Sequence, residues 1–144
     1  MDNQLYIPPQ GPPQQSAPQF FDQIGLDKLY EMAWVQYQLF LETSIAHMFP
    51  QDEAGLKEAS EKQAEFMCGL LGGPKIYIEK HGPPRMRARH LPFAIDAEAR
   101  DAWLQCYKQA FRQCDGLGLS KEDQQTLVNW LEGFSAWMVN RAGA

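Results

Sequence analysis

Apolar residues recur every three or four positions along most of the chain after residue 19, and this spacing builds one face of an α-helix. Four long segments show the pattern, at about residues 20–42, 52–71, 96–115 and 120–137. In the first of them the apolar face is expected to hold Tyr30, Trp34, Tyr37 and Leu41. No segment alternates apolar and polar residues as a strand would, and no internal repeat is present. The pattern therefore predicts an all-α fold.

Residues that cap helices stand where these segments begin. Asp52, Asp96 and Ser120 each precede an apolar pattern, and side chains of this kind accept hydrogen bonds from the first backbone amides of a helix. Asp123 follows Ser120 by three residues, in the manner of a capping box. The sequence Gly72-Gly73-Pro74 is expected to end the second segment.

A shorter segment, RMRARHLPFAI at residues 85–95, differs from the four long ones. Prolines precede it, and Pro92 disfavours a helical conformation at the residue before it, so a helix of barely two turns is expected to end near His90. Arg87 and Arg89 would point to different sides of this helix. One imidazole for a central iron, with guanidinium groups for an anionic edge, is the arrangement that binds haem. Taken alone, the segment is more typical of a solvated basic turn with a surface histidine, because charge runs usually mark an exposed face.

Two polar side chains interrupt the predicted apolar faces. Gln63 lies among Leu56, Ala59, Phe66, Met67 and Leu70, and a buried amide must find a hydrogen-bond partner, a water or a ligand. Trp103 lies on the inward face of the third segment, where its indole N–H also needs an acceptor. Each residue has an ordinary interpretation as part of the core.

Composition limits the organisation and the classes of function. Residues 1–18 are rich in Pro and Gln and poor in apolar residues, so we expect an N-terminal tail before a single domain at residues 19–141. The net charge of −5 favours neither nucleic acid nor an anionic membrane as a partner. A membrane span, a signal peptide, a disulfide framework and a zinc site are not indicated, so a cytoplasmic location is expected.

The stretch from Leu70 to Tyr107 resembles the truncated haemoglobins, particularly their second group. The resemblance rests on Gly72-Gly73-Pro74, on Tyr77, on HGPPRMRARHLPF at residues 81–93 and on RDAWLQCY at residues 100–107. Upstream, FFDQIG and KQAEFMCGLLGGP extend it, so that about residues 19–140 are covered. It implies a two-over-two helical sandwich, a shortened globin, around a b-type haem (iron protoporphyrin IX).

The resemblance implies roles for individual residues near the haem. His90 matches the proximal iron ligand. The expected haem contacts are the propionate partners Arg89, Arg87 and Tyr77, the packing residues Phe49, Phe66, Met67 and Phe93, and the loop residue His81. His47 does not match the ligand position, but it or His81 could approach a propionate or the distal rim.

On the distal side, Gln63, Ala59 and Trp103 match positions that face a bound gas ligand. The family usually places a tyrosine there on an earlier helix. Counting from Phe49 gives Gln36 and counting from Phe20 gives Gln38, whereas a gap on each side gives Tyr37, which we take as the expected residue.

The function implied is reversible binding of dioxygen, carbon monoxide and nitric oxide. Three distal donors would slow dioxygen release and favour sensing, nitric oxide dioxygenation or peroxide chemistry over bulk delivery, and such turnover requires a reductant such as a reductase. A helical interaction module without a cofactor is the main alternative. A metal enzyme using His47, His81 and His90 is a weaker one, because their spacing matches no helical ligand pair.

Overall fold

The computed structural model describes residues 5–142 and contains helices but no strand in that range. Its helices are α1 (Phe21–Ile24), α2 (Leu26–Phe40), η1 (Ala46–Met48), α3 (Glu53–Leu70), α4 (Ile76–His81), α5 (Met86–His90), α6 (Ala97–Gln113), η2 (Asp115–Gly118) and α7 (Lys121–Met138). The all-α prediction is confirmed. None of the helices in the described part of the chain is both long and apolar enough to cross a membrane.

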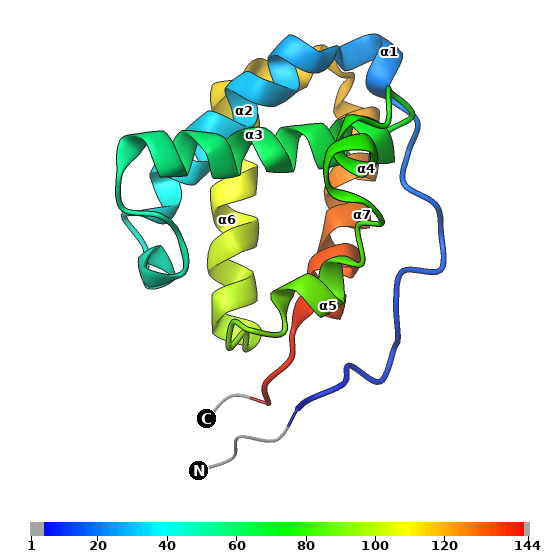
Figure 1. Cartoon of the computed structure of the whole chain (residues 1–144). Coiled ribbons are helices and arrows are strands. Elements are labelled where there is room, and N and C mark those ends of the chain that lie inside the picture. Colours follow the sequence, from blue (N-terminus) through cyan, green and yellow to red (C-terminus); the bar gives the residue numbers. More distant parts are fainter. Residues whose placement is uncertain (1–4, 143–144) are drawn as a thin grey trace.

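The four long helices form two layers. Helices α2 and α3 cross each other at the top of Figure 1, while α6 and α7 run down side by side beneath them. The contacts of α2 with both α3 and α6 join the two layers. This is the expected two-over-two sandwich, and the short helices α4 and α5 connect α3 to α6 along one side of it.

The predicted caps are confirmed by hydrogen bonds. The Asp52 carboxylate accepts from the Gly55 amide at 2.8 Å, and the Asp96 carboxylate accepts from the Ala99 amide at 2.8 Å. The Ser120 hydroxyl accepts from the Asp123 amide at 3.1 Å. Each side chain satisfies one of the amides that the start of a helix leaves without an intrahelical partner.

Two elements differ from the sequence expectation. The first segment is divided at Gly25, whose φ of 85° lies in the region that favours glycine, so α1 and α2 are separate. Residues 76–81 form α4, which the apolar pattern did not predict because the helix is only six residues long. This helix carries Tyr77 into the interior.

The buried face of α2 is also rotated from the predicted one. The expected residues Tyr30, Trp34 and Leu41 are only half-buried. Because α2 lies between α3 and α6, its buried residues spread over a wider surface: Leu29, Met32, Ala33, Gln36, Tyr37 and Phe40. The helix therefore buries a glutamine that the apolar pattern left out.

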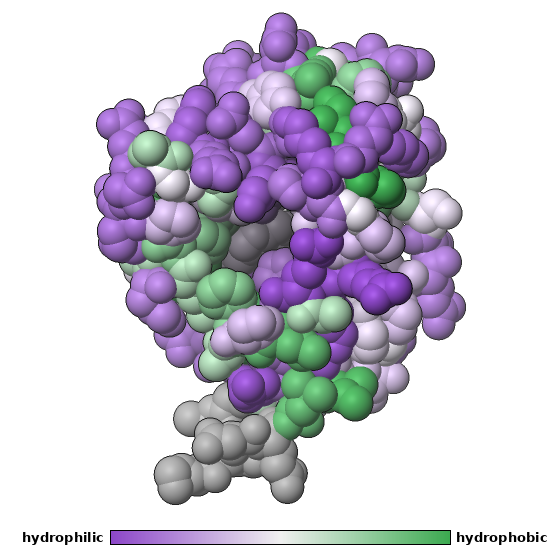
Figure 2. Space-filling model, in the orientation of Figure 1, coloured by the Kyte–Doolittle hydropathy of each residue, from purple (hydrophilic) through white to green (hydrophobic). Residues whose placement is uncertain are grey.

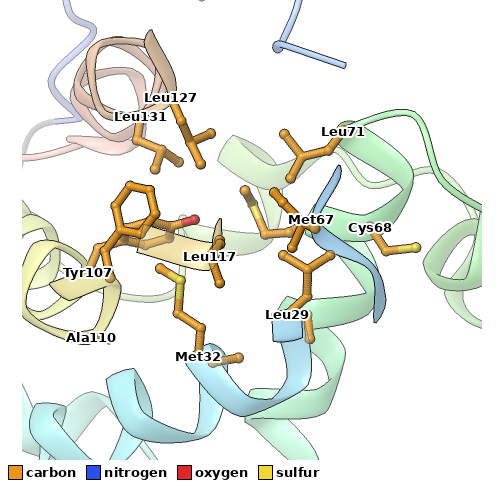
Figure 3. Packing of buried hydrophobic residues seen from close by; sticks show 14 of the residues in the cluster. Leu29, Met32, Met67, Cys68, Leu71, Tyr107, Ala110, Leu117, Leu127 and Leu131 are labelled. Atoms are coloured by element: carbon orange, nitrogen blue, oxygen red, sulfur yellow. The ribbon is translucent and has the colours of Figure 1, made fainter. Parts of the chain in front are cut away.

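The main core fills the space where the two layers meet. Figure 3 shows Leu29 and Met32 of α2 meeting Met67 and Leu71, with Tyr107, Leu117, Leu127 and Leu131 on the other side. A second, smaller cluster includes Tyr37, Phe40, Ile45, Leu56 and Ile95. Between the clusters and the short helix α5 the side chains leave a cavity.

The segment before α1 has no helix, yet it lies against the domain. The Tyr6 amide donates to the Asn140 carbonyl at 2.9 Å, and the Trp130 indole donates to the Gln15 carbonyl at 3.0 Å. Ala17 is buried. The composition predicted a segment that cannot order itself; residues 5–18 follow the side of α7 because the domain supplies their partners (Figure 1).

Candidate functional site

A cavity of about 460 Å³ lies between α3, α5, α6 and α7. Figure 2 shows the hollow near the middle of this face, with apolar surface on its left and lower margins and hydrophilic surface on its right. Most of the predicted site residues line it: Tyr37, Phe49, Ala59, Gln63, Phe66, Met67, Tyr77, Arg89, His90, Phe93 and Trp103. Arg87 and His81 do not.

His90 is the last residue of α5 and lines the cavity. Its Nδ1 lies 2.6 Å from the Met86 carbonyl oxygen, which can only accept a hydrogen bond. The hydrogen is therefore assigned to Nδ1, and Nε2 keeps a free lone pair. A metal-binding imidazole is commonly held in this way, by a hydrogen bond from its other nitrogen.

Of the two arginines beside His90, one faces the cavity and the other does not. Arg89 lines the cavity while donating to the carbonyls of His81, Pro83 and Pro84 at 2.7–3.0 Å. None of the hydrogen bonds among the described residues uses its Nη1, which leaves donors for an anion. Its guanidinium thus also holds the turn between α4 and α5.

Arg87, which was expected to contact a propionate, does not line the cavity. Its guanidinium donates to the carbonyls of Trp137 and Val139 at 2.6 and 2.7 Å, and to that of Tyr6 at 2.7 Å. It also lies over the Trp137 ring. Since these carbonyls belong to the end of α7 and to the N-terminal segment, Arg87 joins α5 to both chain ends instead of facing the cavity.

The other two histidines lie outside the cavity. His81 is exposed, with its ring 4.9 Å from that of Tyr77, and His47 is exposed on η1. Among residues 5–142, no three or more His, Cys, Asp or Glu side chains gather where they could hold a metal ion. This arrangement gives the alternative of a three-histidine metal enzyme no support.

In the wall of the cavity formed by α2 and α3, here called the distal wall, three side chains are linked in series by hydrogen bonds. The buried Tyr37 hydroxyl donates to Gln63 Oε1 at 3.2 Å, and Gln63 Nε2 donates to Gln36 Oε1. Burial raises the pKa of Tyr37, so the phenol stays protonated. Gln36 lies behind this wall and Gln38 is exposed. Of the three candidates that counting left open, Tyr37 therefore reaches the cavity.

Trp103 of α6 lines the same part of the cavity, and its ring centroid lies 5.5 Å from that of Tyr107. No hydrogen bond among the described residues uses its indole N–H. Phe49 closes the wall, stacked on Phe40 at 4.2 Å and edge-on to Tyr37 at 5.3 Å. The indole N–H is thus available beside an apolar wall.

Sequence reasoning missed several lining residues. Lys62 is the most informative, because it is exposed at the cavity and makes no ion pair among the described residues. Its place just before Gln63 on α3 could have indicated it. Phe134 and Met138 also line the cavity, from positions four apart on α7. These residues carried no signal beyond an ordinary apolar face.

Asn140 was also missed, although it holds the segment that carries His90. Fully buried after α7, it accepts from the Ile95 amide at 2.9 Å through Oδ1. Its Nδ2 donates to the carbonyls of His90 and Phe93 at 3.2 and 3.0 Å. Both ends of one amide thus secure the chain on either side of Pro92.

The cavity fits a haem on three observations. Its wall is mostly apolar, as a porphyrin face requires. His90 presents a free Nε2 to it, and the cationic Lys62 and Arg89 lie at its exposed margin, where anionic propionates would be solvated. Figure 1 shows α3 above α5 in the domain, and Gln63 of α3 and His90 of α5 both line the cavity.

A two-over-two helical sandwich with this cavity defines a globin. The model of the bacterial-like globins matches residues 19–140. The chain belongs to this family, and its cofactor is accordingly haem b. Haem-based gas binding follows from membership, so the alternative of a helical module without a cofactor is not supported.

Individual relatives point to the second group of truncated haemoglobins. Group 2 truncated hemoglobin YjbI of Bacillus subtilis (strain 168) is 45% identical over 97 residues, which are 67% of this chain and 69% of the relative. The group II truncated haemoglobin of Bacillus anthracis superposes with a TM-score of 0.77 at 31% identity, covering 91% of this chain and 97% of that one. The truncated oxygen-avid haemoglobin of Bacillus subtilis superposes with a TM-score of 0.74 at 39% identity, covering 83% of this chain and 98% of that one.

Proposed function

We propose that the chain holds haem b through His90 and binds dioxygen, carbon monoxide and nitric oxide reversibly, with slow release of dioxygen. The observation that carries this proposal is that one cavity brings the free Nε2 of His90 together with Tyr37, Gln63 and Trp103. When bound, haem supplies an iron centre with an open coordination position for a diatomic gas.

The chain's own residues would hold the cofactor through its iron, its propionates and its ring. His90 supplies Nε2, while the hydrogen bond from its Nδ1 to Met86 fixes the ring. Arg89 and Lys62 line the cavity and would be the cations that bind the propionates, and the buried Tyr77 packs beside Phe66 with ring centroids 5.8 Å apart. Phe93, Phe49 and Met67 supply apolar contact with the ring.

The distal residues decide how long dioxygen stays. Gln63, Trp103 and Tyr37 carry N–H or O–H groups, and dioxygen in the cavity accepts hydrogen bonds when it gains negative charge. Each such bond contributes about 1 kcal/mol, so three together would slow release by roughly 100-fold. The name of one relative, an oxygen-avid haemoglobin, agrees with this direction.

Slow release favours dioxygen sensing, nitric oxide dioxygenation or peroxide chemistry over bulk delivery. Turnover of that kind consumes electrons, so a reductase is the partner that we propose for it. The Ala59 side chain, one turn before Gln63, leaves the space beside the amide open to a ligand.

The test is the dioxygen dissociation rate of the reduced holoprotein by stopped flow. Tyr37→Phe, Gln63→Leu and Trp103→Phe should each raise the rate about five-fold or more, because each removes one donor. Trp34→Phe is a matched control, since Trp34 lies outside the cavity lining. If all three variants release dioxygen at the wild-type rate, the proposed distal role is wrong.

A further inference from the structure

Gln36 is a buried polar residue that the proposed function does not use. It is fully buried on α2, and its Oε1 accepts from Gln63 Nε2. Its own Nε2 has no partner, and within residues 5–142 it is the only buried side-chain nitrogen or oxygen in this condition. A buried N–H group without an acceptor is costly, so its retention calls for an explanation.

The direction of the hydrogen bonds places Tyr37 at one end of a series and Gln36 at the other. The Tyr37 hydroxyl donates to Gln63 Oε1, and Gln63 Nε2 donates to Gln36 Oε1. A phenol has a single hydrogen to donate. In this arrangement that hydrogen is used within the protein, so Tyr37 offers a ligand no donor.

The same side chains allow a second arrangement. A half-turn of an amide about its last bond exchanges nitrogen and oxygen with little change of shape. If both amides turn, Gln63 Nε2 donates to the Tyr37 oxygen and Gln36 Nε2 donates to Gln63 Oε1. The unpaired buried atom becomes the Gln36 oxygen, and a buried oxygen without a donor is better tolerated than an N–H without an acceptor.

The second arrangement releases the Tyr37 hydrogen toward the cavity. Without an acceptor there, both arrangements contain two hydrogen bonds along the series. A gas ligand that accepts a hydrogen bond adds a third only to the second arrangement, and such a difference shifts an equilibrium between two states. Dioxygen accepts hydrogen bonds far better than carbon monoxide, so it would favour the turned state more.

We propose that Gln36 is a positioning residue whose amide, by turning together with that of Gln63, switches the Tyr37 hydroxyl from the protein to dioxygen in the cavity. Gln36 does not line the cavity and acts only through the two residues in front of it. The proposal rests on the proposed function, since it requires that Tyr37 stabilises the ligand.

The experiment is a double-mutant cycle on the dioxygen dissociation rate of the reduced holoprotein. Gln36→Glu supplies only acceptors when ionised, which locks Gln63 in the first arrangement and keeps the Tyr37 hydrogen on the protein. We expect the rate to rise about five- to ten-fold. In the Tyr37→Phe background the same substitution should change the rate less than two-fold, because the group through which it acts is gone.

A second variant covers the case that a buried carboxyl prevents folding or becomes protonated. Gln36→Met has neither donor nor acceptor, so nothing holds the turned Gln63, and the rate should rise in the Tyr37 background only. The carbon–oxygen stretching frequency of the carbonyl form is an independent readout. It should move in both Gln36 variants toward the Tyr37→Phe value, since a donor near the ligand lowers it. Gln38→Glu, on the exposed face of the same helix, is the control.

The outcomes separate the two proposals. If Tyr37→Phe raises the rate and the Gln36 variants raise it equally with and without Tyr37, Gln36 acts by packing and the switch is overturned. If Tyr37→Phe raises the rate and the Gln36 variants leave it unchanged, the switch is likewise overturned while the proposed function stands. If Tyr37→Phe itself has no effect, the proposed distal role of Tyr37 fails first.

Discussion

The two walls of the cavity are held in different ways. On the proximal side, α5 has only five residues and is tied to distant parts of the chain. Asn140 binds the backbone of His90, Phe93 and Ile95 through both ends of its amide, and Arg87 of α5 donates to three carbonyls elsewhere. On the distal side, α2 and α3 are long, yet the polar series between them leaves Gln36 Nε2 unpaired.

This difference follows from what each wall must do. A metal ligand must stay in one orientation, and a short helix cannot provide that alone, so the rest of the chain fixes it. A distal donor has to serve the protein when no gas is bound and the gas when it is. Because Gln36 Nε2 is unpaired between two rigid helices, the distal donor can change its hydrogen-bond partner without movement of the backbone.

The largest effect is expected from breaking the proximal side at Asn140. Asn140→Leu has a similar volume but leaves the Ile95 amide and the carbonyls of His90 and Phe93 without their partner, which should lower the free energy of unfolding by about 3 kcal/mol. Urea unfolding and the rate of haem transfer to an acceptor protein measure it. Asn129→Leu, at an exposed position of α7, should change neither. Equal losses in the two variants would show that the hydrogen bonds of Asn140 contribute nothing to stability.

A smaller loss is expected at Arg87. Arg87→Met keeps the aliphatic stem but removes the hydrogen bonds to both chain ends, and we expect about 1–2 kcal/mol less stability because water can replace part of them. Urea unfolding with and without haem measures the loss, with Arg112→Met as the exposed control. The loss should be the same in both forms. If it appears only with haem, Arg87 contacts the cofactor after all.

On the distal side, Gln36→Met should raise the free energy of unfolding instead of lowering it. Removing the unpaired buried amide should raise the unfolding free energy by about 1 kcal/mol, while dioxygen leaves faster. Thermal unfolding followed by circular dichroism measures the first effect. A clear fall in stability would mean that Gln36 is held by its existing hydrogen bond more strongly than its unpaired nitrogen costs.

The smallest effect is expected at Glu65 of α3, whose carboxylate is hydrogen-bonded to Lys80 of α4. The Tyr30 hydroxyl donates to Glu65 at 2.7 Å and the Lys80 ammonium donates at 3.0 Å. Burial alone would raise the pKa of Glu65, but these hydrogen bonds and the charges of Lys80 and His81 lower it. The resulting stabilisation is complete above the carboxyl's ordinary pKa of 4.5 and is lost as pH falls toward its lower folded value.

Glu65→Gln therefore should remove part of the acid dependence of unfolding below pH 4.5, and a series of unfolding curves at descending pH measures it. Glu61→Gln, an exposed residue of the same helix, is the control. An unchanged acid dependence in Glu65→Gln would contradict the assignment. The partner Tyr30 has its pKa raised to about 12 by burial and by the Glu65 carboxylate, so it stays protonated throughout.

The sequence was sufficient wherever a local pattern decides the structure. The caps at Asp52, Asp96 and Ser120 depend on hydrogen bonds three residues away, and the prolines around His90 limit its helix. Much of the cavity lining could be predicted as well, through the resemblance to truncated haemoglobins.

What could not be predicted depends on partners distant in sequence. The direction of Arg87 is set by carbonyls 50 and 52 positions later and 81 positions earlier. Asn140 is a lone polar residue that no periodicity marks. Gln36 is buried because α2 is covered on more than one side, and a single apolar stripe does not reveal that.

The central claim is that His90 holds the haem iron from α5. Its most direct test is the optical spectrum of the protein loaded with haemin, reduced and exposed to carbon monoxide, for the wild type, His90→Ala and the control His81→Ala. We predict a sharp carbonyl spectrum in the wild type and in His81→Ala, and its loss or strong alteration in His90→Ala. A wild-type spectrum in His90→Ala would contradict the claim, because another residue would then hold the iron.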